Sequence, residues 1–294
     1  MQAGFSIVPL GERINYVCKR VVTKSLPTND EKFRSIVCRA EEHLGVLQRC
    51  RGRAFSQAMF YEFGAGPDLI IPLAFYGFGI EHQILVDIRK LSRVMVVNHT
   101  IGQYRRTALD MPRTPERRIA RQGDLVPLLM DHYGIDYRAP CDARDTGIPS
   151  GSIDCITSTN TLEHIPRADI VSILRECRRI LQDDGLVSLQ IDYQDHYAYC
   201  DGSISVYNFL QYSERRWKLF NPGLHYQNRL RHRDYLALVR DTGFKVIEER
   251  RCDSTAADLD LIERLSINKC FRHYTREELT VRSSHIVLQK ELAH

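Results

Sequence analysis

Two glycines with one residue between them, Gly64 and Gly66, follow the apolar run 59–61 and precede a predicted helix over residues 68–78. Glycine at these positions lets the backbone turn sharply and lets a ligand approach the peptide groups closely. Glu62 lies at the end of the apolar run, and its carboxylate suits a positively charged amino group on such a ligand. The pattern predicts a cofactor-binding loop between a strand and a helix.

A second carboxylate follows the next predicted strand, since Asp87 comes directly after Leu85-Val86 and 21 residues after Gly66. An acid at this spacing accepts hydrogen bonds from the two hydroxyls of a ribose. Asp68 stands where dinucleotide-binding loops carry a third glycine, and a carboxylate there would repel a pyrophosphate at the helix start. The loop therefore favours a nucleoside cofactor without phosphates, although Asp68 could also simply cap the helix.

Three histidines lie beyond predicted strand ends and are candidates for a general base: His164, His196 and His225. Imidazole suits this task because its pKa lies near 6.5. Each histidine could equally pack on a cofactor or hydrogen-bond within its loop, and the three candidates stay open. Asp192, Asp195 and Asp201 surround His196, but their spacing matches no recognised metal site, so we predict none.

Short apolar runs alternate with helical stretches from residue 56 onward, which predicts an α/β fold with a mostly parallel sheet. Six runs are visible, at 59–61, 84–86, 153–156, 186–189, 244–247 and 285–288. Helices are predicted over 68–78, 167–181 and 234–242; Gly243 ends the last, and Asp183-Asp184-Gly185 ends the one before it.

The first 55 residues are predicted to form a helical cap. Apolar residues recur at three- and four-residue spacing from Phe33 to Leu47, and Thr28, Asn29 or Asp30 could cap this helix. Pro27 separates it from a weaker predicted helix over 14–22.

Two connections are longer than an ordinary loop plus a helix. The insert over residues 88–135 carries nine basic and four acidic residues. It is predicted to form either a solvated helical surface or a surface that attracts an anionic substrate. The insert over 192–233 contains Trp217 and several tyrosines. It is either a lid over an organic substrate or a small satellite core above the sheet.

Composition narrows the class of protein. The 294 residues include 41 basic and 37 acidic residues, and a net charge of +4 is too small to indicate a nucleic-acid-binding protein. The longest uncharged stretch, residues 69–80, is too short to cross a bilayer, and the start lacks the pattern of a secretory signal. Nine cysteines without a CxxC pair suit a reducing compartment, so we predict a cytoplasmic protein.

Four stretches in register resemble the class I S-adenosylmethionine-dependent methyltransferases, in particular the methyltransferase type 11 group. They are Glu62-Phe63-Gly64-Ala65-Gly66, Asp87, Cys141-Asp142-Ala143 with Ile148-Pro149 to Asp154, and Thr159–Ile165. A fifth similar stretch, Arg175–Leu181 with Asp184-Gly185-Leu186, precedes the fifth strand of that family. The resemblance covers roughly residues 56–290.

The resemblance implies a seven-stranded, doubly wound sheet and transfer of a methyl group to oxygen or nitrogen of a small organic acceptor. S-adenosylmethionine would be the cofactor, with S-adenosylhomocysteine as product. Its predicted contacts are Glu62, Gly64, Ala65, Gly66, Asp87, Ile88, Asp142, Ala143 and Thr159. Methylation of a protein or RNA and a nicotinamide-dependent oxidoreductase remain alternatives, and the chain is compatible with a homodimer.

Overall fold

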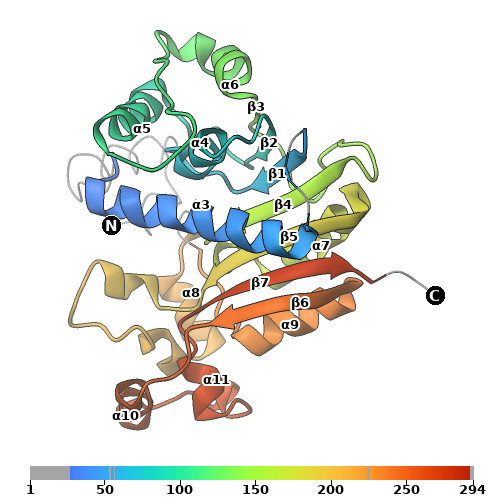
Figure 1. Cartoon of the computed structure of the whole chain (residues 1–294). Coiled ribbons are helices and arrows are strands. Elements are labelled where there is room, and N and C mark those ends of the chain that lie inside the picture. Colours follow the sequence, from blue (N-terminus) through green and yellow to red (C-terminus); the bar gives the residue numbers. More distant parts are fainter. Residues whose placement is uncertain (1–26, 53, 56, 224–225, 292–294) are drawn as a thin grey trace.

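One mixed sheet organises the protein, in a computed structural model that describes residues 27–52, 54–55, 57–223 and 226–291. Its strand order is β3-β2-β1-β4-β5-β7-β6 (Figure 1). The strands are β1 Met59–Phe63, β2 His82–Val86, β3 Ile135–Arg138, β4 Ile153–Thr159, β5 Leu181–Asp192, β6 Phe244–Arg251 and β7 Ser283–Lys290. The predicted seven-stranded α/β fold is confirmed, and the sheet is mixed because β7 runs antiparallel to β5 and β6.

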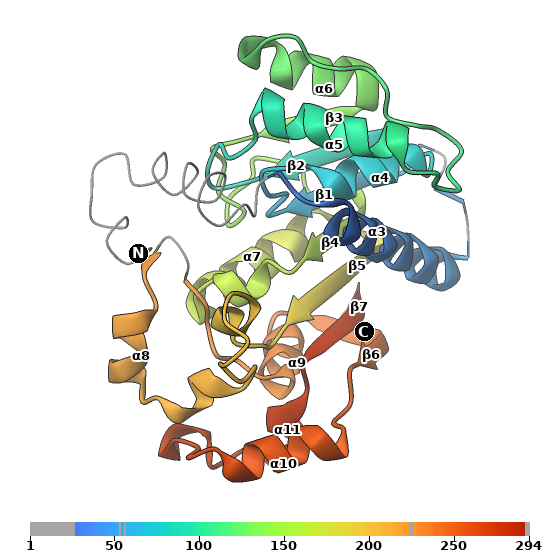
Figure 2. The same ribbon diagram turned by 90° about the vertical axis from the view of Figure 1, so that its left-hand side faces the viewer.

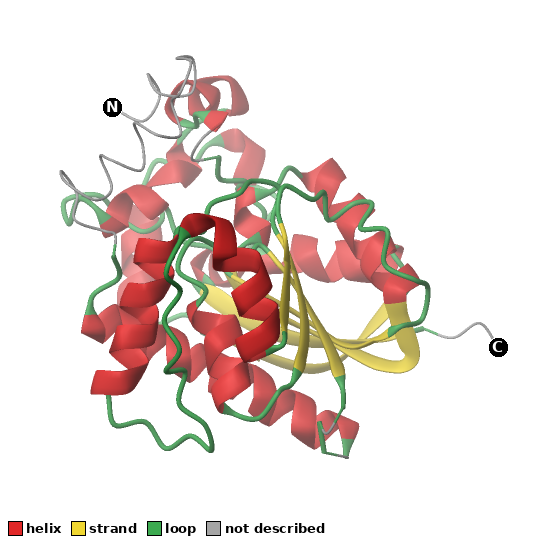
Figure 3. Cartoon of the chain, turned by 90° about the horizontal axis from the view of Figure 1, so that it is seen from above, coloured by secondary structure: helices red, strands yellow, loops and turns green. Residues whose placement is uncertain are grey.

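Helices cover both faces of the sheet (Figures 2 and 3). One face carries α3 Asp30–Arg51, α4 Ile70–Gly77, α5 Val94–Arg106 and α6 Leu125–Tyr133, which share one buried apolar cluster with β1 and β3. The other face carries α7 Arg167–Ile180 and α9 His232–Asp241 over a second cluster. No helix in the described ranges is long and apolar enough to cross a membrane.

The predicted helix near the N-terminus is present as α3. Its N-cap is Asn29, whose side chain accepts a hydrogen bond from the amide of Lys32. Apolar residues on one side of the helix, including Phe33 and Leu47, are fully buried against the sheet. The weaker helix predicted over 14–22 lies outside the described residues, and the division at residue 55 stays a prediction.

A series of hydrogen bonds between side chains also holds α3 to the sheet. Nδ1 of the fully buried His43 lies 2.7 Å from the Ser188 hydroxyl of β5, and its Nε2 lies 3.1 Å from the Thr159 hydroxyl of β4. Nε2 of His285 on β7 lies 2.7 Å from the same Ser188 hydroxyl. Burial lowers the pKa of both histidines, to about 4 for His285, so both rings are neutral near pH 7.

The strand boundaries differ from the sequence prediction at two places. The apolar pattern missed β3, because only Ile135 and Tyr137 of its four residues are buried. The predicted stop at residues 183–185 lies inside β5, which begins at Leu181 directly after α7. Leu181 is fully buried and pairs with Ile153 of β4, so the sheet continues through the acidic turn.

Most of the aromatic insert forms a satellite core. After β5 the chain makes the 3-10 turns η3 His196–Tyr199 and η4 Asn208–Gln211 and the helix α8 Glu214–Phe220. These pack against α10 Ala256–Arg264 and α11 Arg276–Thr280 from the β6–β7 connection. Trp217 and Tyr207 are buried there, whereas Tyr199 is 58% exposed, so the core interpretation holds for the first two.

One buried arginine ties this satellite core to the sheet. Arg231 is fully buried, and its guanidinium donates hydrogen bonds to the carbonyl oxygens of Tyr193, Leu279 and Val281, at 2.7, 2.9 and 2.6 Å. Without Arg231, each of these carbonyl oxygens would lose its hydrogen-bond donor in a place that water reaches poorly. A buried polar group without a partner lowers the free energy of unfolding.

We expect Arg231→Leu to lower the free energy of unfolding by about 3 kcal/mol, since three carbonyls lose their donor. Urea denaturation followed by circular dichroism measures the loss. Arg233→Leu is the matched control, because the Arg233 side chain is 44% exposed and pairs with Glu278 on the surface. Such a pair contributes about 0–1 kcal/mol. Equal effects of the two substitutions would contradict the role given to Arg231.

Candidate functional site

The glycine loop sits where β1, β2 and β4 end. The Gly64 amide donates to the Val86 carbonyl of β2 at 2.9 Å. Gly64 and Gly66 have φ values of +78° and +71°, a left-handed conformation that favours glycine. The side chain of Thr161, just beyond β4, packs against Gly64 so closely that a Cβ there would overlap it. Gly64 therefore has to be glycine for two reasons, its left-handed backbone and its contact with Thr161, and neither of them depends on a ligand.

Glu62 is a buried carboxylate with an unsatisfied oxygen. Its side chain is 3% exposed, and no described residue hydrogen-bonds its Oε2. Burial, and next to it the negative charge of Asp68, raises the pKa of Glu62 to about 8. A positively charged group beside the glycine loop would satisfy this carboxylate, as the sequence predicts for the amino group of a cofactor.

Asp68 is not the N-cap residue of α4, although its carboxylate accepts from the amide of Ile70 at the start of that helix. The N-cap of α4 is Leu69, in a left-handed conformation and without a side-chain cap. One Asp68 oxygen accepts a hydrogen bond from the Thr28 hydroxyl at 2.8 Å, which fastens the chain just before α3 to this loop.

The predicted ribose and adenine contacts meet at the ends of β2 and β3. Asp87 is 7% exposed, and its carbonyl accepts a hydrogen bond from the Cys141 amide at 2.9 Å. Ile88 beside it is 62% exposed, an unusual position for an isoleucine. Asp142 pairs with Arg144 at 2.6 Å, which lowers the pKa of Asp142, and Ala143 is half-buried.

Thr159 faces α3 through its hydroxyl, which bonds to His43. The Thr159 hydroxyl is thus turned toward α3, and its cofactor contact stays a prediction, whereas Thr161, two residues on, lies over the glycine loop. The Thr161 hydroxyl donates to the carbonyl oxygens of Thr159 and Gly64, at 3.1 and 3.3 Å.

Two of the three candidate histidines lie together. The rings of His164 and His196 are 4.9 Å apart between centroids. His164 Nδ1 lies 2.9 Å from the carbonyl oxygen of Tyr226, and His196 Nε2 lies 3.4 Å from Oδ2 of Asp192. Of the three aspartates that surround His196 in the sequence, Asp192 is thus the one whose carboxylate faces its ring. His225 lies outside the described residues.

The other carboxylates near His196 serve the local chain. Asp195 caps η3 by accepting from the Tyr197 amide, and Asp201 accepts from the amide and hydroxyl of Ser203. The site residue missed from the sequence is Glu163, in the turn η2 Leu162–His164, which is 1% exposed and adjoins both histidines. In the sequence, the feature that points to Glu163 is its position directly before the candidate base His164.

Two cavities lie near these elements. One of about 510 Å³ opens between α3 and the ends of β4 and β5, with Arg39, Glu42, Asn160, Gln190 and His285 in its lining. Burial raises the pKa of Glu163 well above its usual range, and the charge of Arg39 opposes this shift, so this cavity and the histidine pair share one edge of the sheet.

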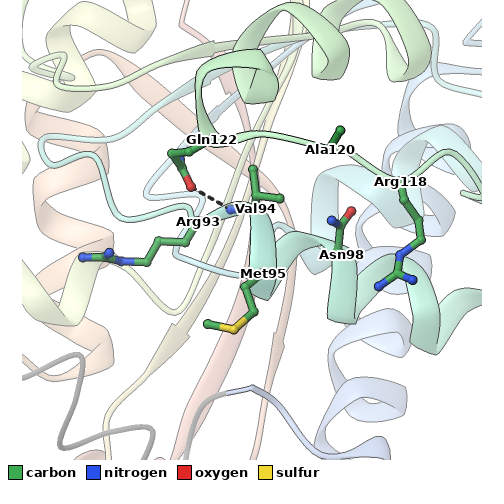
Figure 4. Close-up of a pocket in the computed structure, with 7 residues that line it drawn as sticks. All are labelled: Arg93, Val94, Met95, Asn98, Arg118, Ala120 and Gln122. Carbon is green, nitrogen blue, oxygen red and sulfur yellow. Dashed lines mark hydrogen bonds between the residues drawn. The ribbon is translucent and has the colours of Figure 1, made fainter.

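The other cavity, of about 660 Å³, lies between α5 and residues 118–122 of the basic insert (Figure 4). The amide of Val94 donates to the side chain of Gln122 across it at 2.9 Å. Arg93 and Arg118 line this cavity, and none of the predicted site residues does.

The chain matches known methyltransferases. Residues 104–189 match the family model of a methyltransferase domain. A stretch of 72 residues is 39% identical to the sphingolipid C9-methyltransferase of Candida albicans. The aligned stretch covers 21% of this chain and 14% of that relative. The match therefore spans a small part of the curated relative.

Solved methyltransferases resemble the fold at low identity. The 1,6-didemethyltoxoflavin N1-methyltransferase of Burkholderia thailandensis is 12% identical, with a TM-score of 0.49, over 95% of this chain and 87% of that one. The geranyl diphosphate C-methyltransferase of Streptomyces coelicolor is 14% identical, with a TM-score of 0.48, over 90% and 84%.

The family match and the sheet agree with the resemblance that the sequence motifs suggest. Residues 104–189 match a methyltransferase domain model, and the seven-stranded α/β sheet is the fold that this resemblance implies. The activity of the whole protein is accordingly the subject of the proposal below, and the nicotinamide-dependent oxidoreductase on the same fold stays an alternative prediction.

Gly64 and Gly66 form a natural matched pair for a test. A Cβ at Gly64 would overlap Thr161, whereas a Cβ at Gly66 would meet open space. Both Gly→Ala substitutions cost roughly 1–2 kcal/mol because of the left-handed backbone. We expect Gly64→Ala to cost more than Gly66→Ala, and Thr161→Ala to recover part of the difference. Chemical denaturation of the three single variants and of the Gly64→Ala/Thr161→Ala double variant measures this; equal losses for the two glycines would contradict the packing against Thr161.

Proposed function

We propose that the protein transfers a methyl group from S-adenosylmethionine to an oxygen or nitrogen of a small organic acceptor. The observation that carries this proposal is the unsatisfied Glu62 carboxylate beside the glycine loop, on the same sheet edge as Asp87. The cofactor supplies an electrophilic methyl group on a positively charged sulfur. The small acceptor, and the cytoplasmic location that the cysteine usage predicts, are parts of the same proposal.

The residues present fit this cofactor. Glu62 would hold its ammonium group, and the backbone of Gly64, Ala65 and Gly66 would lie against its methionine part, as in the family resemblance. Asp87 would accept hydrogen bonds from the ribose hydroxyls. Ile88 is exposed beside Asp87 and offers an apolar surface to the adenine, next to Asp142 and Ala143.

The acceptor would bind from the side of α3 and β5. The 510 Å³ cavity opens at the ends of β4 and β5 and has a mixed polar lining, which suits a small organic molecule with hydroxyl or amino groups. His164 and His196 adjoin this edge and would receive the acceptor's proton if they act as bases.

We expect Asp87→Ala to weaken binding of S-adenosylhomocysteine at least about tenfold, because each hydroxyl–carboxylate bond contributes roughly 1.5–3 kcal/mol. Isothermal titration calorimetry measures the affinity. Asp145→Ala is the control, since Asp145 is exposed and close along the chain. Unchanged affinity in Asp87→Ala would remove this residue from the cofactor site and sink the proposal.

Cofactor binding should also release a proton. Glu62 has a pKa of about 8 without ligand, so it is mostly protonated at pH 7. An ammonium group beside it favours the carboxylate and lowers this pKa, so binding releases a proton below about pH 8 and the apparent affinity rises with pH up to that point. Calorimetric titrations in buffers of different ionisation enthalpy measure the released proton. Glu62→Gln should abolish this release, and a buffer-independent binding heat at pH 7 in the unaltered protein would contradict the assignment.

A further inference from the structure

Three potential metal ligands meet beyond β4 and β5. Glu163 and His164 come from η2, and His196 comes from η3. One ligand atom of each lies within 4.8 Å of the other two. The residues are far apart in sequence and close in space because β4 and β5 are neighbouring parallel strands, whose following loops lie at the same edge.

The Glu163 carboxyl group is buried without a side-chain partner. It is 1% exposed, and no side chain within the described ranges hydrogen-bonds either of its oxygens. Burial raises the pKa of this carboxyl group well above its usual range, and the backbone amides of Glu163 and Asp192 and the charge of Arg39 oppose that shift only in part. Protonation would not remedy this, because the carboxylic acid would then be a buried donor without an acceptor. A cation between Glu163 and the imidazoles would satisfy both oxygens.

The two histidines are oriented for such a role. A carbonyl oxygen can only accept, so His164 Nδ1 must carry the proton in its 2.9 Å contact with Tyr226, and the neutral ring has its lone pair on Nε2. Histidines that bind metals commonly donate their other nitrogen to a carbonyl or carboxylate in this way.

Nε2 of His196 is buried and faces the carboxylate of Asp192 at 3.4 Å. Asp192 is itself held by the Tyr199 hydroxyl and by the amide of Gln194. The His196 ring therefore has a fixed carboxylate neighbour at Nε2, which can orient the ring and raise its basicity, so a metal ion would bind through Nδ1.

We propose that Glu163, His164 and His196 bind a divalent transition-metal ion, with Asp192 as a positioning residue for His196. Two imidazoles and one carboxylate form a donor set typical of catalytic zinc, with a coordination position left for a further ligand. Mg²⁺ and Ca²⁺ prefer oxygen donors and fit this set less well. Ligands in a tetrahedral zinc site lie roughly 3.3 Å apart, so the side chains have to close by up to about 1.5 Å. The sequence predicted no metal site, on the basis of the carboxylates in residues 192–201. The site proposed here uses different ligands.

A metal ion at this place would specify the acceptor, and this consequence rests on the proposed methyl transfer. A hydroxyl oxygen bound to a divalent ion has a lowered pKa, so no histidine is needed as a base. The proton would leave to solvent, and the acceptor atom would be oxygen. His164 and His196 would then act as ligands and not as bases.

The test is a metal titration of the full chain after removal of bound metal with a chelator. We expect one Zn²⁺ per chain by calorimetry and a visible absorption band on addition of Co²⁺. Glu163→Gln and His196→Gln should each weaken Zn²⁺ binding at least tenfold, and Asp192→Asn by roughly 10–100-fold. His82→Ala is the control for surface binding, since His82 is exposed at the start of β2.

The outcomes separate this inference from the proposed function. Absence of a stoichiometric site, or equal Zn²⁺ affinity in Glu163→Gln, His196→Gln and His82→Ala, overturns the metal site. Titration of each metal-free variant with S-adenosylhomocysteine checks folding and tests the cofactor proposal independently. A variant that binds S-adenosylhomocysteine normally and has lost Zn²⁺ supports the site, whereas loss of both in Glu163→Gln and His196→Gln alike indicates a structural role and overturns it.

Discussion

The contact between the Thr161 side chain and the Gly64 backbone determines how the two halves of the site lie together. It requires a residue without Cβ at position 64, in a left-handed conformation. Because Thr161 also starts the turn η2 and accepts the His164 amide through its carbonyl, the turn is fixed on the glycine loop. The glycine loop and the histidine pair therefore share one rigid junction.

Asn228 holds the same turn from the opposite side. Its side-chain amide donates to the carbonyl oxygens of Leu162 and Ile165, both at 2.8 Å, and its own amide donates to the carbonyl of Glu163 at 2.7 Å. The Tyr235 hydroxyl in turn donates to the Asn228 side chain at 3.1 Å. Such bonding satisfies the turn's backbone groups and fixes the directions of Glu163 and His164 before any ligand arrives.

Sequence patterns gave those parts of the molecule that depend on local spacing. Alternating apolar runs predicted six of the seven strands, and turn glycines predicted the loop between β1 and α4, because these signals lie within a few residues of one another. The four-residue β3 carried too few apolar positions to be visible. Glu163 and His196 lie together only because β4 and β5 are neighbouring strands, so their proximity could not be predicted from the sequence. Asp192 and His196, in contrast, are only four residues apart. The burial of Trp217 against Phe271 likewise depends on a connection 54 residues further on.

The hydrogen bonds that join His43, Ser188 and His285 limit the pH range in which helix α3 stays packed on the sheet. Both rings have a lowered pKa in the folded protein, whereas in an unfolded chain they take up a proton near pH 6.5. The stability that they contribute is complete above pH 6.5 and is lost as the pH falls toward about 4, where His285 becomes charged inside the fold. Acid would therefore weaken the attachment of α3, and with α3 one wall of the 510 Å³ cavity would be lost.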